Sequence, residues 1–141
     1  MRISRVQMEN YRNIRHVDVA LGNIVALIGE NNSGKSNFLR ALSIPLSSDD
    51  TGVSKRLSWF DINKEVKKQY YEFLKANRSS NVDGSLSVEA FLPQIPTVTI
   101  LLNITPEATE HYDVKDILVD EDTWTGGILY QFSLSIKAAN S

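Results

Sequence analysis

Residues 29–36 read Gly-Glu-Asn-Asn-Ser-Gly-Lys-Ser, and this stretch decides how the whole chain is interpreted. A glycine is followed by four residues, a second glycine, a lysine and a serine, which is the spacing of a phosphate-binding loop. The apolar run 24–28 precedes the loop, and residues 37–42 after it have helical spacing. Strand, loop and helix in this order are the context that the motif requires.

The residue types in this loop each have a physical reason. Gly29 and Gly34 have no side chains, so the backbone can pass close to a phosphate group. The loop amides and the positive end of the helix dipole then face the same anion. Lys35 adds a compact positive charge for the β- and γ-phosphates, and Ser36 offers a hydroxyl oxygen to Mg²⁺. The sequence therefore predicts a site for a nucleoside triphosphate.

Composition limits the class of protein. The chain has 141 residues, of which 42% are hydrophobic and 23% charged, as expected of one soluble globular domain. Its formal net charge is −2, so bulk charge does not point to nucleic acid. It has no cysteine, which excludes disulfides and thiolate metal sites. No apolar run approaches the roughly 20 residues of a membrane span and no signal peptide is evident, so we expect a cytoplasmic protein without membrane partners.

Alternating apolar residues, one unbroken apolar run and a segment rich in β-branched residues predict strands, and helical spacing predicts two helices. The expected strands are 2–8, 17–21, 24–28, 85–92, 97–104 and 128–136. The strand 24–28 should be covered on both faces because its apolar residues are consecutive, and the strands after residue 85 should be antiparallel neighbours. The expected helices are 35–42, stopped by Pro45, and 64–76, with Asp61 as its cap.

Four lysines and one tyrosine allow more than one interpretation. The lysines of the second predicted helix are most simply a solvated face, with a nucleic-acid contact as the alternative; they are Lys64, Lys67, Lys68 and Lys75. Tyr11 is interpreted as a core residue, with an adenine-stacking platform as the alternative.

Residues 1–46 resemble a known family through three features. Asn10-Tyr11-Arg12 ends the first predicted strand, Asn31-Asn32-Ser33 lies inside the loop, and Asn37-Phe38-Leu39-Arg40-Ala41-Leu42 follows it. Together they resemble the N-terminal part of ABC-type ATPase heads, and most closely the group of OLD (overcoming lysogenization defect), RecF and SMC proteins, with the OLD-type AAA ATPases nearest.

The resemblance implies an α/β fold: a P-loop NTPase of the ABC-head type, here an incomplete N-terminal lobe with an antiparallel β subdomain. Residues 1–46 would hold the strands, loop and following helix, residues 47–84 a loop and helical insertion, and residues 85–141 the antiparallel strands. ATP and Mg²⁺ are the implied cofactors, with Ser36 as the metal ligand. The implied binding residues are Gly29, Asn31, Asn32, Ser33, Gly34, Lys35, Ser36, Asn37 and, near the nucleotide, Arg12. For Arg12, an ordinary surface arginine in a turn is the alternative.

Other motifs of such heads are missing from this sequence. Thr125-Gly126-Gly127 is only a fragment of a signature motif and is interpreted as a turn. The stretch 117–121 superficially resembles the Asp-Glu strand that completes a catalytic site, but an acidic turn explains it as well. Catalytic residues therefore stay unassigned, and ATP hydrolysis is expected only when missing elements complete the head.

Three functions follow from this sequence. The first is ATP binding as part of an OLD- or RecF-like ATPase of DNA processing or phage defence, with a second head or the remainder of the head as partner and DNA reached through missing parts. The second is a small P-loop phosphotransferase or GTPase, although Asn63-Lys64-Glu65-Val66 fails at the last position of a guanine-reading motif. The third is a structural partner that dimerises with another head around nucleotide.

Overall fold

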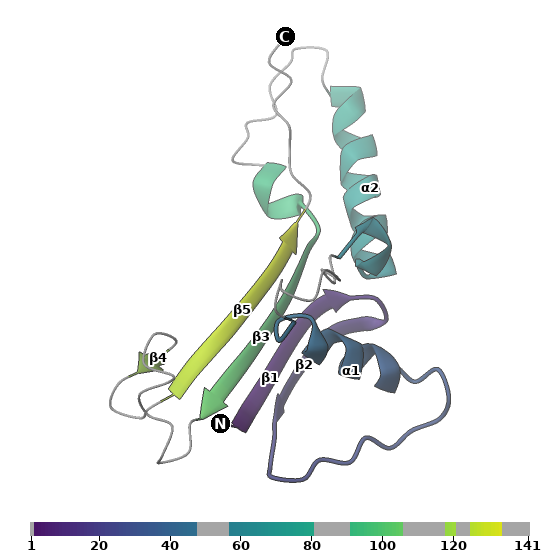
Figure 1. Cartoon of the computed structure of the whole chain (residues 1–141). Coiled ribbons are helices and arrows are strands. Elements are labelled where there is room, and N and C mark those ends of the chain that lie inside the picture. Colours follow the sequence, from purple (N-terminus) through teal and green to yellow (C-terminus); the bar gives the residue numbers. More distant parts are fainter. Residues whose placement is uncertain (1, 48–56, 81–90, 106–117, 121–124, 134–141) are drawn as a thin grey trace.

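One antiparallel sheet dominates the molecule (Figure 1). The computed structural model describes residues 2–47, 57–80, 91–105, 118–120 and 125–133. The strands follow the order β2-β1-β3-β5-β4, and every neighbouring pair is antiparallel. Their bounds are β1 Arg2–Tyr11, β2 Ile14–Ala20, β3 Thr97–Thr105, β4 Leu118–Asp120 and β5 Thr125–Ser133. The predicted antiparallel pairing of the last strands is thus confirmed for β3 and β5.

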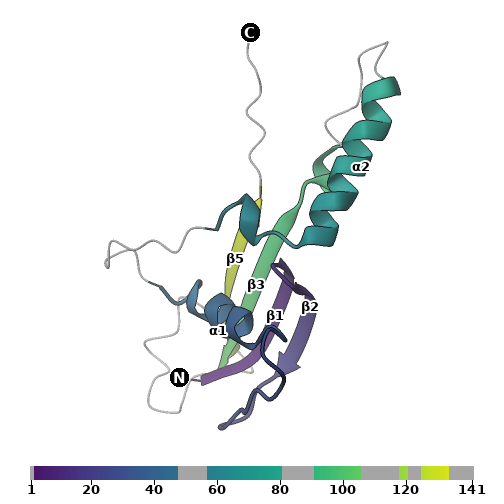
Figure 2. The same cartoon turned by 90° about the vertical axis from the view of Figure 1, so that its right-hand side faces the viewer.

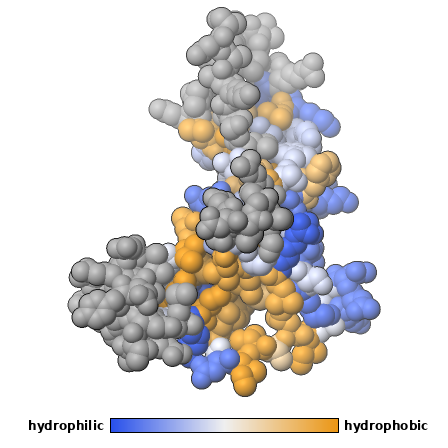
Figure 3. All heavy atoms as spheres, in the orientation of Figure 1, coloured by the Kyte–Doolittle hydropathy of each residue, from blue (hydrophilic) through white to orange (hydrophobic). Residues whose placement is uncertain are grey.

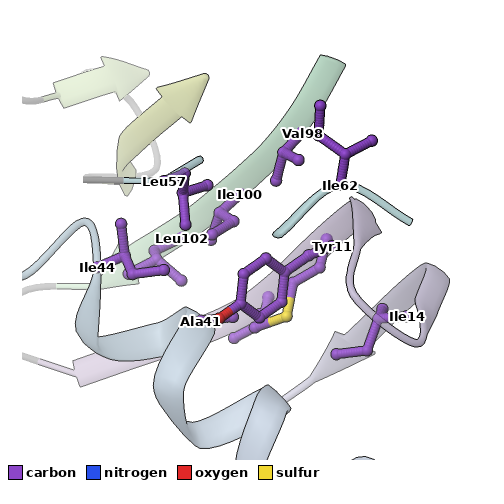
Figure 4. Close-up of a cluster of buried hydrophobic side chains, with 11 residues drawn as sticks. Tyr11, Ile14, Ala41, Ile44, Leu57, Ile62, Val98, Ile100 and Leu102 are labelled. Atoms are coloured by element: carbon purple, nitrogen blue, oxygen red, sulfur yellow. The ribbon is translucent and has the colours of Figure 1, made fainter. Parts of the chain in front are cut away.

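The core lies on one face of this sheet. Exposure alternates along β3, where every second side chain from Val98 to Ile104 is buried, because successive residues of a strand point to opposite faces. Met8 of β1 stands opposite Ile100, and both are fully buried. In Figure 4, Ile100 and Leu102 lie on the side of the sheet that faces helix α1 (Lys35–Ser43), which adds Ala41 to the cluster. The sheet therefore supplies the floor on which α1, and the loop before it, is held.

Helix α1 begins immediately after the loop and ends at Ser43, two residues before Pro45, which cannot continue a helix. Gly34 occupies the position before its first residue with φ 103°, a left-handed conformation that suits glycine. Ala41 is fully buried against the sheet, and Ile44, which follows the last helical residue, is 4% exposed. The predicted helix over 35–42 is confirmed, with its end one residue later.

The β1–β2 hairpin turns more tightly than the sequence suggests. β1 continues through Tyr11, so only Arg12 and Asn13 form the turn. Asn10 and Arg12 have positive φ angles of 60° and 49°, which are uncommon for residues with side chains. Tyr11 is fully buried, as its interpretation as a core residue predicts. Arg12 and Asn13 therefore lie at the end of the hairpin, where they can contact other segments.

Helix α2 (Lys64–Ser80) extends beyond the end of β1 and β2 (Figure 2). The Asn63 side chain accepts a hydrogen bond from the Glu65 amide at 3.0 Å, which is the bond of an N-terminal cap. The prediction that Asp61 caps this helix is therefore wrong. Asp61 instead ends a separate short 3₁₀ turn, Trp59–Asp61. The ring of Trp59 packs edge-on against the rings of Tyr70 and Tyr71 of α2.

The strand predicted over residues 24–28 is absent from the structure. This segment has no strand pairing, and Ile24 and Ile28 are 93% and 94% exposed. A strand forms only where another strand completes its hydrogen bonds, and none of the described strands lies beyond β2 at this edge of the sheet. Figure 3 shows hydrophobic residues at the surface over the lower half of one face, and the exposed apolar residues of the segment are Ile24, Val25, Leu27 and Ile28.

Two further interpretations need correction. Thr125-Gly126-Gly127 does not form a turn, since it begins strand β5 and pairs with β3. Residues 118–120 are likewise a short edge strand rather than an acidic turn. The predicted strand 85–92 lies mostly outside the described residues, and Leu92 belongs to a 3₁₀ turn. The predicted strand 128–136 corresponds to β5, which begins earlier, at Thr125, and is described as far as Ser133.

Candidate functional site

The loop before α1 is organised around Lys35. Its Nζ donates hydrogen bonds to the carbonyl oxygens of Gly29 and Glu30, the latter at 2.6 Å, and to Ser33 Oγ at 3.4 Å. The ammonium group is therefore folded against the inside of its own loop. An anionic oxygen placed there would replace neutral acceptors by a charged one, which strengthens a hydrogen bond to an ammonium group.

Two glycines leave space that a side chain would fill. A Cβ atom on Gly29 would lie 2.8 Å from Ser33 Oγ, and one on Gly34 would lie 2.6 Å from Asn13 Nδ2. Gly34 also has the positive φ that glycine tolerates best. The loop conformation consequently depends on glycine at both positions that the phosphate-binding motif prescribes.

The N-terminus of α1 opens toward this loop. No side chain caps the first turn, and the Gly34 carbonyl accepts the first helical hydrogen bond, from the Phe38 amide at 2.9 Å. Free amides at a helix N-terminus carry partial positive charge and favour an anion. The helix start and the Lys35 ammonium group thus belong to the same short stretch of chain, as a phosphate site requires.

A pocket of about 340 Å³ lies over the loop and the first residues of α1. It is lined by Asn13, Asn31, Asn32, Gly34, Lys35, Ser36 and Asn37. Six of these seven residues are among those that the sequence predicts. Gly29 and Ser33 do not line this pocket, and both accept hydrogen bonds from the Lys35 ammonium group. The lining is polar, with amide, hydroxyl and ammonium groups, which suits a phosphate chain better than an apolar ligand.

Arg12 lies beside the pocket rather than in its lining. Its Nη1 donates to Asn37 Oδ1 at 3.2 Å, while Nε and Nη2 both contact Asp61 Oδ1 at 2.8 Å. Burial raises the pKa of Asp61, but the Ser58 amide and the Arg12 guanidinium outweigh it and hold this pKa below its usual value. Asp61 is therefore ionised at neutral pH and pairs with Arg12 as a carboxylate.

Asn13 is the site residue that the sequence does not predict. Its Oδ1 accepts a hydrogen bond from Asn37 Nδ2 at 2.8 Å, and its side chain lies against Gly34. The only signal in the sequence is an asparagine directly after Arg12. Nothing in that pattern says that the β1–β2 turn returns to the loop, which is a property of the tertiary fold.

A magnesium ion would be held with little help from protein ligands. Ser36 lies in the pocket lining with an exposed side chain, in the position that the motif gives to the Mg²⁺ ligand. Among the described residues, no group of three or more His, Asp or Glu side chains could hold a metal by itself. This donor set fits Mg²⁺, which commonly keeps several waters and takes its remaining ligands from phosphates.

Asp120 is not brought to the loop. It pairs through β4 with β5, at the edge of the sheet opposite β2. The loop side of the molecule is the β2 edge, since Val17 and Val19 line a shallow apolar groove together with Val25 and Ile28. Asp120 therefore lies away from the candidate site.

The family of the chain follows from a match over most of its length. Residues 1–120 match the model of the AAA ATPase domain family, and the chain belongs to this family. The match supports a P-loop NTPase fold and nucleotide binding. Searches of curated proteins and of solved structures gave no match. Of the helices in the described part of the chain, neither is long and apolar enough to cross a membrane.

Proposed function

We propose that residues 29–36 bind the triphosphate of ATP together with Mg²⁺. Gly29, Asn31, Asn32 and Ser33 would form the turn of the loop, and Gly34 would let the backbone approach the phosphates. Lys35 would supply the charge and Ser36 the metal ligand. The observation that carries this proposal is the convergence of the Lys35 ammonium group, the uncapped start of α1 and a polar pocket on one short stretch of chain.

The test is calorimetric titration of the chain with Mg·ATP. We expect saturable binding that Lys35→Ala weakens at least tenfold, because a charge-assisted hydrogen bond contributes roughly 1.5–3 kcal/mol. Lys68→Ala is the matched control, since Lys68 is an exposed lysine on α2 and should leave the affinity unchanged. Absence of binding by the unmodified chain, or equal loss in both variants, would overturn the proposal.

The position of Asn63 counts against a guanine-reading motif at residues 63–66. This asparagine is 7% exposed and uses both ends of its amide, donating to the Arg12 carbonyl at 2.7 Å and accepting from Glu65. It is thereby unable to read a guanine base as the first residue of Asn-Lys-x-Asp would. Equal competition of GTP with labelled ATP would instead support the alternative of a small GTPase or phosphotransferase.

We further propose that the chain binds ATP with negligible hydrolysis. Hydrolysis needs a group that orients water and groups that stabilise transferred charge, in addition to a phosphate-binding loop. The described residues place no carboxylate in the pocket lining, which consists of amides, a hydroxyl, a lysine and a glycine. Turnover that Lys35→Ala abolishes would show that a catalytic group is present after all.

The resemblance to OLD, RecF and SMC heads supports a wider proposal. The three segments 1–46, 47–84 and 85–141 would form the N-terminal lobe of an ABC-type head, which pairs with a second head or with the remainder of its own head and serves DNA processing or phage defence. Light scattering with and without Mg·ATP tests the pairing. An increase in mass with nucleotide supports it, and an unchanged mass counts against it.

A further inference from the structure

Asp61 and Arg12 join two segments that are distant in the sequence. Nε and Nη2 of Arg12 both lie 2.8 Å from Oδ1 of the Asp61 carboxylate. The main-chain amide of Arg12 also donates a hydrogen bond to the main-chain carbonyl of Asp61 at 2.7 Å. The side chains of Arg12 and Asp61 are 33% and 10% exposed. The contact is therefore a partly buried clamp made by both main chain and side chains, and not a loose surface ion pair.

The carboxylate of Asp61 is fixed on its other side as well. Its Oδ2 accepts hydrogen bonds from the Ser58 amide at 3.0 Å and from Ser58 Oγ at 3.2 Å. One oxygen thus faces Ser58 while the other faces Arg12. Since both oxygens are used, the carboxylate has one orientation, and this orientation sets the direction of the guanidinium group.

The backbone around Arg12 is held in an unfavourable conformation. Arg12 has φ 49°, a region that residues with side chains seldom occupy. Its carbonyl accepts the Asn63 side chain at 2.7 Å, and the Asn63 amide donates to the Asn10 carbonyl at 2.8 Å. Such conformations persist where surrounding contacts over-determine them, and they cluster at functional sites.

From Arg12 the contacts continue into the pocket. Arg12 Nη1 donates a hydrogen bond to Asn37 Oδ1, and Asn37 Nδ2 donates one to Asn13 Oδ1 at 2.8 Å. Asn37 and Asn13 both line the pocket, and Asn13 lies against Gly34. The pair Asp61–Arg12 is thus connected by hydrogen bonds to two amides of the pocket lining.

We propose that Asp61 is a positioning residue of the phosphate site, which acts through Arg12 to hold the Asn37 and Asn13 amides in the orientation that binds nucleotide. This inference rests on the proposed ATP binding. Asp61 touches neither the pocket nor the loop, so its effect on affinity has to pass through Arg12. The 3₁₀ turn before α2 thereby becomes part of the nucleotide site.

The test is a double-variant cycle on the full chain, with Mg·ATP affinity as the readout. Asp61→Asn and Arg12→Gln should each weaken binding about tenfold, and the double variant should be no weaker than either, because residues of one network are not additive. Asp18→Asn is the matched control. It removes the carboxylate of an exposed ion pair, Arg5–Asp18, between β1 and β2. The affinity for Mg·ATP should stay unchanged.

Stability separates positioning from simple support of the fold. If Asp61→Asn lowers the melting temperature but the folded variant binds Mg·ATP as the unmodified chain does, the inference is overturned. Additive losses in the double variant would overturn it too. Arg12→Lys is the second variant, should Asp61→Asn not fold. Lysine can keep the ion pair but cannot also reach Asn37, so affinity should fall while the melting temperature stays within a few degrees.

The two proposals fail in different ways. If the unmodified chain does not bind Mg·ATP, ATP binding itself is wrong and the role of Asp61 falls with it. If the unmodified chain binds and Asp61→Asn and Arg12→Lys bind equally well, ATP binding stands and only the positioning role is wrong.

Discussion

The antiparallel sheet and the loop segment 22–34 use apolar residues in opposite ways. In the sheet, Met8 and Ile100 stand opposite one another, hydrogen-bonded through their strands and fully buried. In the loop segment, Ile24 and Ile28 are equally apolar but more than nine-tenths exposed. The difference shows that the apolar character of a run states a requirement for burial, whereas burial itself depends on a partner strand or helix.

The comparison also separates stability from function. The sheet holds the core cluster, and α1 is fixed on it through Ala41. The loop segment adds little to that core, but it contains Gly29 and Gly34 of the candidate site, and Lys35 follows directly after it. Changes in the sheet should therefore affect folding, whereas changes at the loop should affect ligand binding.

The largest expected effect is on stability, in a matched pair of isoleucine variants. Ile100→Ala removes a fully buried side chain and should lower the free energy of unfolding by about 2–5 kcal/mol. Ile28→Ala truncates a side chain that is 94% exposed and should change it by less than about 0.5 kcal/mol. Urea denaturation followed by circular dichroism measures both. A similar cost for the two variants would mean that the loop segment is buried in solution and contributes to the core as the sheet does.

A matched pair of glycine variants should give the next largest effect, on binding. Gly34→Ala places a Cβ atom where φ is 103° and Asn13 is 2.6 Å away, so the loop must relax. Restoring the binding conformation should cost about 1–2 kcal/mol, which weakens Mg·ATP binding about tenfold. Gly22→Ala meets only the Ile24 carbonyl oxygen, at 3.9 Å, and should bind normally. Equal affinities for the two variants would show that the Gly34 conformation is unimportant.

Much of this division could be predicted from the sequence, for physical reasons. The many β-branched residues of 97–104 predict a strand because branched side chains fit a pleated, half-buried surface. The spacing of Gly29, Gly34, Lys35 and Ser36 predicts the loop because the phosphate chemistry needs those residue types at those positions.

The remaining features depend on contacts between distant segments. Asn13 enters the pocket only because the β1–β2 hairpin turns back toward Gly34. Asp61 meets Arg12 across 49 residues of sequence. The run 24–28 looks like a buried strand because sequence periodicity cannot tell whether a neighbouring strand is available. The local sequence pattern thus predicts most helices and strands. The contacts between distant segments become visible only in the folded structure.

The smallest expected effect concerns the ion pair on the surface of the sheet. Arg5 and Gln7 donate hydrogen bonds to the Asp18 carboxylate, and these bonds lower the pKa of Asp18 to about 2. Because the folded-state pKa lies below the unfolded value of about 3.9, the stabilisation is present above about pH 4 and is lost as pH falls toward 2. Carbon-13 titration of the side-chain carboxylate should show this, and Arg5→Gln should raise the pKa. An ordinary Asp18 pKa in the unmodified chain would show that the pair does not form.

The central claim is that main-chain amides of residues 29–36 and the Lys35 ammonium group hold a triphosphate. Nitrogen-15 spectra of the chain, recorded while Mg·ATP is added, test it most directly. We expect the largest amide shifts between Gly29 and Asn37, with small shifts along β3, and we expect Lys35→Ala to remove them. Saturable binding of Mg·ATP that leaves the loop amides unmoved would contradict it.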